Sequence, residues 1–324
     1  MRAQQITELS GPASALQLAE VPEPGPEHFT TNAEGVVVDV RAACVSFPEL
    51  LQTRGLYQLK PPLPFVPGSE VAGVVRSAPA GAPVREGDRV AAFCMLGGFA
   101  EVAVAPDFMT FALPDALDFA QGAGLILNYH TAYFALKLRG RLAEGETVLV
   151  HGAAGGVGTA SIQVAKGLGA RAIGVVSSDE KERVAREAGA DEVLRSDGPW
   201  KDQAKEAGGV DVVIDPVGGD RFTDSLRSLR EGGRVVVVGF TAGEIPEVRV
   251  NRLLLNNVEV VGAGWGAYVL GKPDVFREIG EAVLALGVDP IVGARFPLER
   301  AGEALSLLEE RGALGKLVLE LDGE

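Results

Sequence analysis

A glycine-rich segment that directly follows an apolar run is the clearest chemical signal in the chain. The apolar run covers residues 147–151, and residues 152–158 read Gly-Ala-Ala-Gly-Gly-Val-Gly. Gly155 lets the backbone approach a pyrophosphate, and Gly158 lets a helix pack closely on the preceding strand. The free N–H groups at the helix start then meet the phosphate charge. This pattern indicates a dinucleotide site, for which the alternative is an ordinary tight strand-to-helix turn. The expected ligands are Ala154, Gly155, Gly156 and Val157.

The end of the next apolar run, Arg171 to Val176, decides which dinucleotide is bound. NAD-selective sites place an acidic residue there, about 20 residues past the glycines, to bind the ribose 2′-hydroxyl. This chain instead has Ser177 and Ser178, and Lys181 and Arg195 follow as candidates to neutralise a 2′-phosphate. Three alternatives remain: Ser177 forms a capping box with Glu180, the two cations are solvated surface charges, and Asp179 caps the helix or binds the ribose. Hydroxyls with nearby cations favour NADPH as the cofactor.

Continuous apolar runs alternate with amphipathic segments from the glycine motif onward. Buried strands are expected at residues 171–176, 210–214, 234–238 and 258–261, with helices at 159–168, 181–188 and 221–229. Such runs indicate a parallel sheet covered on both faces, and right-handed crossovers make it doubly wound. The sequence therefore predicts an α/β protein with a Rossmann domain at residues 123–269.

The first third of the chain predicts a different kind of domain. Short strands are expected at residues 36–41, 71–75, 88–93 and 99–104, separated by turns rich in proline and glycine. Residues 61–68 hold four prolines and must form a loop, because proline lacks the backbone donor. A helix at 131–138 leads toward the Rossmann domain. A helix near 300–310 and a strand at 316–321 close the chain, and this strand is expected to return to the first domain. We expect an irregular, barrel-like β domain made of residues 1–122 and 270–324.

Composition excludes several classes of protein. The chain has 324 residues, 47% of them hydrophobic and 23% charged, with a formal net charge of −14. The acidic balance argues against a nucleic-acid partner, and no apolar run is long enough to span a membrane. Residues 1–4 lack a hydrophobic signal core. Cys44 and Cys94 are too few for a disulfide framework, so we expect a cytoplasmic protein.

Several further motifs, in this order, resemble those of the medium-chain dehydrogenase/reductases. They are Pro67-Gly68-Ser69-Glu70-Val71-Ala72-Gly73, Gly87-Asp88-Arg89-Val90, the glycine motif at 151–158, Ala190-Asp191-Glu192-Val193, Asp215-Pro216-Val217-Gly218-Gly219 and Gly315-Lys316-Leu317-Val318. Within that class, the chain resembles the zeta-crystallin-like quinone oxidoreductases over essentially its whole length. The resemblance implies a GroES-like catalytic domain beside the Rossmann domain.

The zinc alcohol dehydrogenases share these motifs, so metal binding must be tested on the residues. Their catalytic zinc needs a thiolate, an imidazole and a further ligand. By the family's motif, the thiolate position falls at Ser46 and the imidazole position at Ser69. Cys44 and Cys94 are expected to be buried small hydrophobes, and His28, His130 and His151 lack metal-ligand spacing. We therefore expect no metal.

The resemblance also implies a set of site residues. Tyr57 matches the family's active-site tyrosine, for which packing of a loop is the alternative, and Ser46 stands where quinone oxidoreductases often have asparagine. Both are expected to be catalytic. The remaining residues are expected to line the cofactor site: Thr131, Gly239, Phe240, Gly264, Trp265, Gly266 and Lys316.

Without a Lewis acid, the expected chemistry is hydride transfer from NADPH to an acceptor that needs little activation. A small-molecule quinone or another conjugated carbonyl compound (an enone) is such an acceptor. A 2-enoyl thioester reductase and a non-catalytic NADPH-binding protein are the alternatives. The apolar run Val258 to Ala263 resembles the family's last Rossmann strand, which pairs with its copy, so we expect a homodimer.

Overall fold

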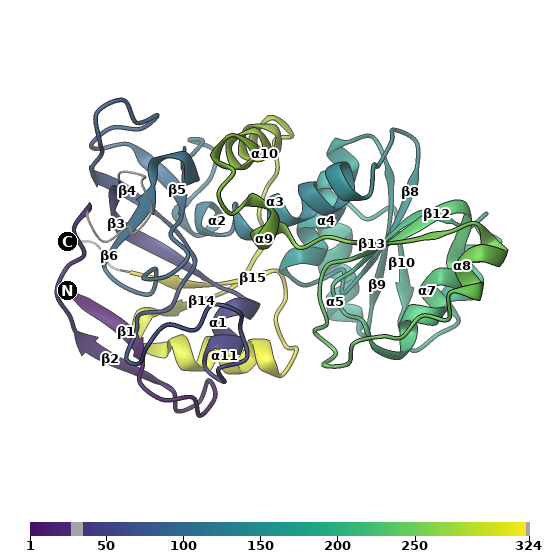
Figure 1. Ribbon diagram of the computed structural model, residues 1–324, viewed down its shortest axis with the longest axis horizontal. Helices are drawn as coiled ribbons and strands as arrows, with labels where there is room; N and C mark the ends of the chain where they lie inside the picture. The colour runs from purple at the N-terminus through teal and green to yellow at the C-terminus, as the bar shows by residue number, and fades with distance from the viewer. Residues whose placement is uncertain (27–34, 322–324) are drawn as a thin grey trace. The chain divides into compact units, whose positions relative to one another are not determined.

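The computed structural model describes residues 1–26 and 35–321, so His28 lies outside the described residues. The chain divides into two compact units (Figure 1). Unit 1 comprises Met1–Leu127, Pro273–Gly280 and Asp289–Glu324, and unit 2 comprises Asn128–Lys272 and Glu281–Val288. Each unit has its own sheet, so each is described by itself below.

Unit 2 is built on a six-stranded sheet of order β10-β9-β8-β11-β12-β13. All its neighbouring strands run parallel. The strands are β8 (Thr147–His151), β9 (Arg171–Val176), β10 (Glu192–Arg195), β11 (Val210–Asp215), β12 (Leu229–Val237) and β13 (Glu259–Gly262). The helices are α3 (Leu127–Tyr133), α4 (Gly156–Gly167), α5 (Asp179–Glu187), α6 (Trp200–Glu206), α7 (Phe222–Ser228), α8 (Asn251–Asn256) and α9 (Trp265–Val269). In Figure 1, α4 and α5 lie on one side of this sheet and α7 and α8 on the other.

The burial of the central strands explains this arrangement. Every residue of β8 and of β11 is buried, which is the pattern of strands covered on both faces. Residues of β8, β9, β11 and β12 share one core cluster with Trp200 and Phe222 of the helices. The predicted doubly wound Rossmann fold is therefore confirmed.

Unit 1 is built on a seven-stranded sheet of order β14-β15-β3-β4-β5-β7, with β6 pairing on β3, and on a separate β1-β2 pair. Neighbouring strands are antiparallel, apart from the parallel pair β14-β15. The strands are β1 (Arg2–Ile6), β2 (Leu16–Glu20), β3 (Gly35–Val45), β4 (Glu70–Ser77), β5 (Arg89–Phe93), β6 (Val102–Pro106), β7 (Thr110–Ala112), β14 (Val292–Pro297) and β15 (Lys316–Glu320). The helices are α1 (Phe47–Gln52), α2 (Phe119–Ala123) and α11 (Ala301–Glu309), and α10 (Pro273–Ala285) is divided between the units.

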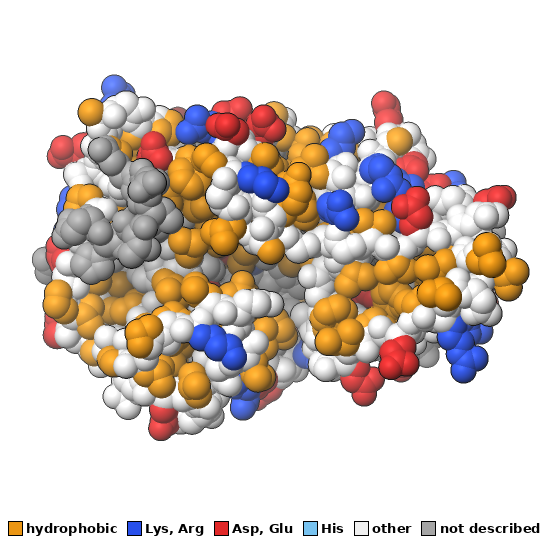
Figure 2. Space-filling view, in the orientation of Figure 1, with side chains coloured by type: hydrophobic (Ala, Val, Ile, Leu, Met, Phe, Trp, Pro, Cys, Tyr) orange, Lys and Arg blue, Asp and Glu red, His pale blue; other side chains and the backbone are white. Residues whose placement is uncertain are grey.

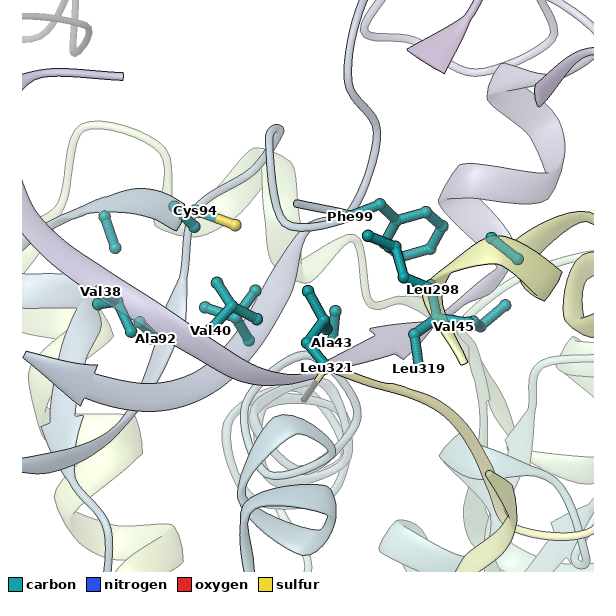
Figure 3. Packing of buried hydrophobic residues seen from close by; sticks show 14 of the residues in the cluster. Val38, Val40, Ala43, Val45, Ala92, Cys94, Phe99, Leu298, Leu319 and Leu321 are labelled. Carbon is teal, nitrogen blue, oxygen red and sulfur yellow. The ribbon is translucent and has the colours of Figure 1, made fainter. Parts of the chain in front are cut away.

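Strand β15 joins the C-terminal part of the chain to the first part. It pairs antiparallel with β3, with Leu317 opposite Val45. Side chains of β3, β5 and β15, among them Val40, Ala92 and Leu319, meet in one core cluster (Figure 3). The expected return of the last strand to the first domain therefore occurs.

Two local features differ from the sequence expectations. The helix expected at residues 131–138 ends as α3 at Tyr133 and continues as a π-helix over Phe134–Arg139. Helix α5 begins one residue later than a Ser177 cap would require, because Ser178 is its N-cap. None of the described helices is long and apolar enough to cross a membrane.

Candidate active site

The glycine motif forms the turn between β8 and α4. Gly152 has a φ of +60°, in the left-handed region that favours glycine. Gly155 is the N-cap of α4, and its N–H donates to the Gly152 carbonyl at 3.0 Å. A Cβ at Gly158 would lie 2.1 Å from the Gly152 oxygen, so only glycine fits there. The turn leaves the first N–H groups of a twelve-residue helix at the end of β8, which suits a pyrophosphate.

Two cations meet at Ser177, directly after β9. Lys181 Nζ donates to Ser177 Oγ at 3.3 Å, and Arg195 Nη2 donates to the Ser177 carbonyl at 2.9 Å. Ser178 Oγ, and not Ser177 Oγ, accepts the Lys181 N–H as the helix cap. Arg195 also pairs with the exposed carboxylate of Asp179. The exposed Ser177 thus lies between an ammonium and a guanidinium, the arrangement expected for a 2′-phosphate.

The other expected cofactor residues of unit 2 lie either directly after a strand or within a helix. Gly239 with Phe240, and Gly264, follow the ends of β12 and β13. They lie at the carboxyl edge of the sheet, which also carries the glycine turn and Ser177. Trp265 in α9 is buried and meets the ring of His130 edge to face, with centroids 5.7 Å apart. Gly266 is exposed in α9, and Thr131 is half-buried in α3.

Unit 1 holds a buried polar cluster, which we call the Lys316 cluster: Ser46, Glu49, Ser69, Glu70 and Lys316. Lys316 Nζ donates to Ser46 Oγ and to Glu70 Oε1, each at 2.8 Å. Glu70 Oε2 accepts the Leu127 N–H at 2.8 Å. Lys316 was expected among the cofactor ligands, but its ammonium lies here, and its side chain is 3% exposed.

Glu49 binds the two serines of the cluster. Its carboxylate accepts the Ser46 N–H at 2.9 Å and the Ser69 hydroxyl at 2.6 Å. Burial raises the pKa of Glu49 to about 7, against the hydrogen bond from Ser69, which lowers it. Tyr57 is half-buried in the same unit. Burial, and then the charge of Glu49, raise the pKa of its hydroxyl.

The charge state of Lys316 follows from its neighbours. Burial by itself lowers the pKa of Lys316, but the carboxylates around it raise it overall, above all Glu70 in a direct ion pair and then Glu49. The amine is therefore an ammonium, and the cluster contains a fixed positive charge. Burial raises the pKa of the Cys44 and Cys94 thiols, so neither is a ready thiolate ligand.

The residues do not fit a zinc ion. Within residues 1–26 and 35–321, no group of three or more His, Cys, Asp or Glu side chains is placed to hold a metal. Ser46 and Ser69, at the positions where zinc enzymes have ligands, are hydrogen-bonded into the Lys316 cluster.

Two known protein families match this sequence, one in each part of the chain. The family described as "Alcohol dehydrogenase GroES-like domain" matches residues 32–115, and "Zinc-binding dehydrogenase" matches residues 156–285. Together with the fold, they place the chain in the medium-chain dehydrogenase/reductases, a class of oxidoreductases.

Individual relatives narrow the class. The chain is 39% identical to "Quinone oxidoreductase-like protein 2" of Rattus norvegicus over 99% of this chain and 92% of that protein. A crystal structure of a probable oxidoreductase from Mycobacterium abscessus is 43% identical, with a TM-score of 0.87 over 99% of both chains. The quinone oxidoreductase from Thermus thermophilus, solved also in complex with NADPH, is 34% identical over 99% of this chain and 100% of that one, with a TM-score of 0.83. This chain belongs to the quinone oxidoreductase family.

Sequence reasoning missed Glu49 and Glu70 as parts of the site. Lys316 and Ser46 are 270 positions apart, so no local pattern joins them. One signal was present: Ser46 and Glu49 have the spacing of a capping box, which predicts that the Glu49 carboxylate returns to the Ser46 N–H.

Proposed function

We propose that this protein is an NADPH-dependent reductase that transfers a hydride to a quinone or another conjugated carbonyl acceptor without zinc. The nicotinamide of NADPH supplies the hydride, and a proton completes the reduction to give NADP⁺ and the reduced acceptor. The observation that carries the proposal is the pairing of an intact dinucleotide turn with serines at both zinc-ligand positions, Ser46 and Ser69.

The proposed cofactor residues have distinct tasks. Gly155, Gly156 and the helix start bind the pyrophosphate, while Lys181 and Arg195 bind the 2′-phosphate beside Ser177. The segments after β12 and β13, at the carboxyl edge of the unit 2 sheet, line the nicotinamide. Since a 2′-hydroxyl brings no charge to two cations, this site favours NADPH over NADH.

The proposed catalytic residues are Tyr57 and Ser46. A quinone or enone oxygen gains negative charge as the hydride arrives, so a hydroxyl that donates to it lowers the barrier. Tyr57 can act as the donor, because a phenol is protonated near neutral pH, and burial and the charge of Glu49 raise its pKa further. Water would then return the proton to Tyr57.

A panel assay tests this function. NADPH oxidation is followed with quinones, alkenals and short enoyl-CoA esters, on protein dialysed against a chelator and on untreated protein. We expect turnover with quinones or alkenals, equal in both preparations, and no stoichiometric zinc by elemental analysis. Turnover with enoyl-CoA esters alone would instead assign a thioester reductase. Binding of NADPH without any turnover would assign a binding protein, and activity lost with removed zinc would contradict the metal-free mechanism.

A further inference from the structure

The buried ion pair of unit 1 has no evident reason in packing alone. Lys316 and Glu70 are 3% and 1% exposed, and removing two charges from water costs more than a surface pair returns. Replacement of such a pair by apolar residues is often neutral or stabilising. The contacts of the pair therefore suggest a task other than stability.

The hydrogen bonds at Ser46 indicate that task. Ser46 Oγ accepts a hydrogen bond from Lys316 Nζ at 2.8 Å. Its own proton is directed at Glu70 Oε1 across 3.4 Å, far longer than the usual 2.7–2.8 Å of an O–H···O bond. That carboxylate oxygen already accepts from Lys316 at 2.8 Å. The Ser46 proton is thus held weakly, while its oxygen is held firmly.

We propose that Lys316 is a positioning residue that holds and polarises the Ser46 hydroxyl, so that Ser46 donates a hydrogen bond to the acceptor oxygen during hydride transfer. This inference rests on the proposed reductase function. A hydroxyl that accepts from a cation is a stronger donor, because hydrogen bonds in a chain polarise one another. The ammonium supplies buried positive charge where the zinc enzymes use a metal, and Glu70 keeps that charge in place.

The side chain at residue 46 fits this role by its length. The hydroxyl of serine is short enough for the Lys316 ammonium to approach it and Glu70 together. Glu49 fixes the same residue from the backbone side through the Ser46 N–H. Ser46 is therefore held at its backbone nitrogen and at its Oγ, and the hydrogen on the same Oγ is the one that it donates.

A double-mutant cycle tests the coupling between the two side chains. Ser46→Ala and Lys316→Met are each expected to lower kcat for a quinone by about 10- to 100-fold, with little change in KM or in the Kd for NADPH. The double variant should be no slower than the slower single variant, because Lys316 acts only through Ser46. Multiplying effects would overturn the inference, and so would wild-type kcat in Lys316→Met.

The cycle also separates Lys316 from a role in binding the cofactor. A large rise in the Kd for NADPH in Lys316→Met, with kcat retained, would assign the ammonium to the cofactor and overturn the inference. If none of the tested acceptors supports NADPH oxidation by the wild type, the proposed reductase function is wrong, and the inference fails with it. If the wild type is active but the effects of Ser46→Ala and Lys316→Met on kcat multiply in the double variant, only the inference fails.

Folding is controlled in two ways. If Lys316→Met does not fold, Lys316→Met/Glu70→Gln removes both charges and replaces it in the cycle. Arg234→Met is the matched control, because it breaks another largely buried ion pair, with Glu146 in unit 2. Arg234→Met should lose stability but keep the kcat of the folded protein, and an equal fall in kcat would mean that the effect of Lys316 is structural.

A measurement without turnover tests the contact itself. With lysine labelled by nitrogen-15, the buried Lys316 ammonium should give a slowly exchanging resonance that is absent from Lys316→Met. Ser46→Ala should shift this resonance or speed its exchange. A resonance that Ser46→Ala leaves unchanged would overturn the proposed hydrogen bond.

Discussion

At the residue scale, we propose that the cations around Ser177 select the cofactor. Lys181 Nζ and the Arg195 guanidinium both contact Ser177, and Arg195 also pairs with Asp179. The carboxylate of Asp179 is therefore neutralised by a neighbour. A negative 2′-phosphate would be stabilised at this position, whereas a neutral hydroxyl gains less from the two cations.

Lys181→Ala should weaken NADPH binding by about 10- to 100-fold, since a hydrogen bond to a charged group contributes roughly 1.5–3 kcal/mol. The Kd for NADH should change little. Titration of both cofactors measures this, and Arg183→Ala, on the exposed side of the same helix, is the control. Equal losses for the two cofactors would contradict the assignment of Lys181.

Tyr57→Phe should lower kcat by about 10²- to 10³-fold and leave the Kd for NADPH unchanged, because only the donor to the acceptor oxygen is lost. Steady-state kinetics with a quinone measures the effect. Tyr129→Phe removes a hydroxyl bonded to Gln163 in unit 2 and serves as the control. Wild-type turnover in Tyr57→Phe would make Tyr57 a packing residue.

Glu49 predicts a pH dependence of stability. Its pKa is raised from 4.5 to about 7 by burial, so the folded protein holds this proton more tightly than the unfolded chain. The stabilising contribution is therefore complete below about pH 4.5 and is lost as the pH rises through about 7. Ser69 and Lys316 lower the pKa of this carboxyl group and Glu70 raises it, so these neighbours set the pH at which the contribution is lost.

The Glu49→Gln variant has no carboxyl group to ionise at this position. As the pH rises from about 5 to about 8, its free energy of unfolding should therefore fall less than that of the wild type, by a difference on the order of 2–3 kcal/mol. Denaturant unfolding at several pH values measures it, with Glu247→Gln on the surface as the control. Parallel profiles for wild type and Glu49→Gln would show that Glu49 titrates normally.

At the scale of elements, we expect the turn between β8 and α4 to combine a folding task with a binding task. A Cβ at Gly158 would press against backbone, 2.1 Å from the Gly152 oxygen, whereas a Cβ at Gly155 would have only that oxygen nearby, at 3.5 Å. The two glycines are therefore needed for different reasons.

Gly158→Ala should lose about 1–3 kcal/mol of stability and also bind NADPH weakly, because the turn must shift. Gly155→Ala should keep the wild-type Tm but bind NADPH at least about tenfold more weakly, since its methyl group occupies the space of the pyrophosphate. Calorimetry and cofactor titration separate the two. Unchanged NADPH affinity in Gly155→Ala would mean that the phosphates bind elsewhere.

Five of the six strands of unit 2 could be predicted because each overlaps a continuous apolar run, whereas β10, with the sequence Glu-Val-Leu-Arg, has no such run and was missed. β8 and β9 were predicted with their observed bounds, and β11 within one residue. In unit 1, β1, β2 and β14 were missed because they are only partly buried and polar residues or glycine interrupt them, so they show no continuous apolar run. Their places depend on partners distant in sequence, which a local pattern does not contain.

The candidate site also has parts that are local in the sequence and parts that are not. The glycine turn and Ser177 were predictable because a strand-to-helix unit places them within one stretch of sequence. The Lys316 cluster was not, because it is assembled from α1, β4 and β15. Lys316 was noticed only for its motif, and its contacts with Ser46 and Glu70 required the paired strands β15 and β3.

At the scale of the whole molecule, the edge of the unit 2 sheet favours self-association. β13 is an end strand of its sheet. Helix α8, which precedes it, exposes Leu254 and Leu255 to 76% and 75%. Figure 2 shows hydrophobic side chains gathered on the surface around α8. An unpaired strand edge beside exposed leucines favours aggregation. A second copy of the chain, related by a two-fold axis, would cover both, so we propose a homodimer.

Leu254→Lys/Leu255→Lys should convert the dimer to a monomer, because each dimer would bury four added charges. Sedimentation at micromolar concentration measures this, and Leu9→Lys, at an exposed leucine of unit 1, is the control. Because each chain carries a formal charge of −14, added salt should tighten the wild-type dimer. A wild-type monomer at these concentrations would contradict the proposal.

The position of β15 has a consequence for the order of events during synthesis. A ribosome releases β3 and its partners β4 and β6 early, but β15, which pairs with the C-terminal part of β3, and the lysine that neutralises Glu70 come only at residues 316–320. Until then, nascent unit 1 has an open strand edge and a carboxylate without its cation. The strands of unit 2 lie within residues 147–262 and are complete earlier. We therefore expect unit 2 to fold first during translation, and unit 1, although begun first, to finish only once β15 has left the ribosome.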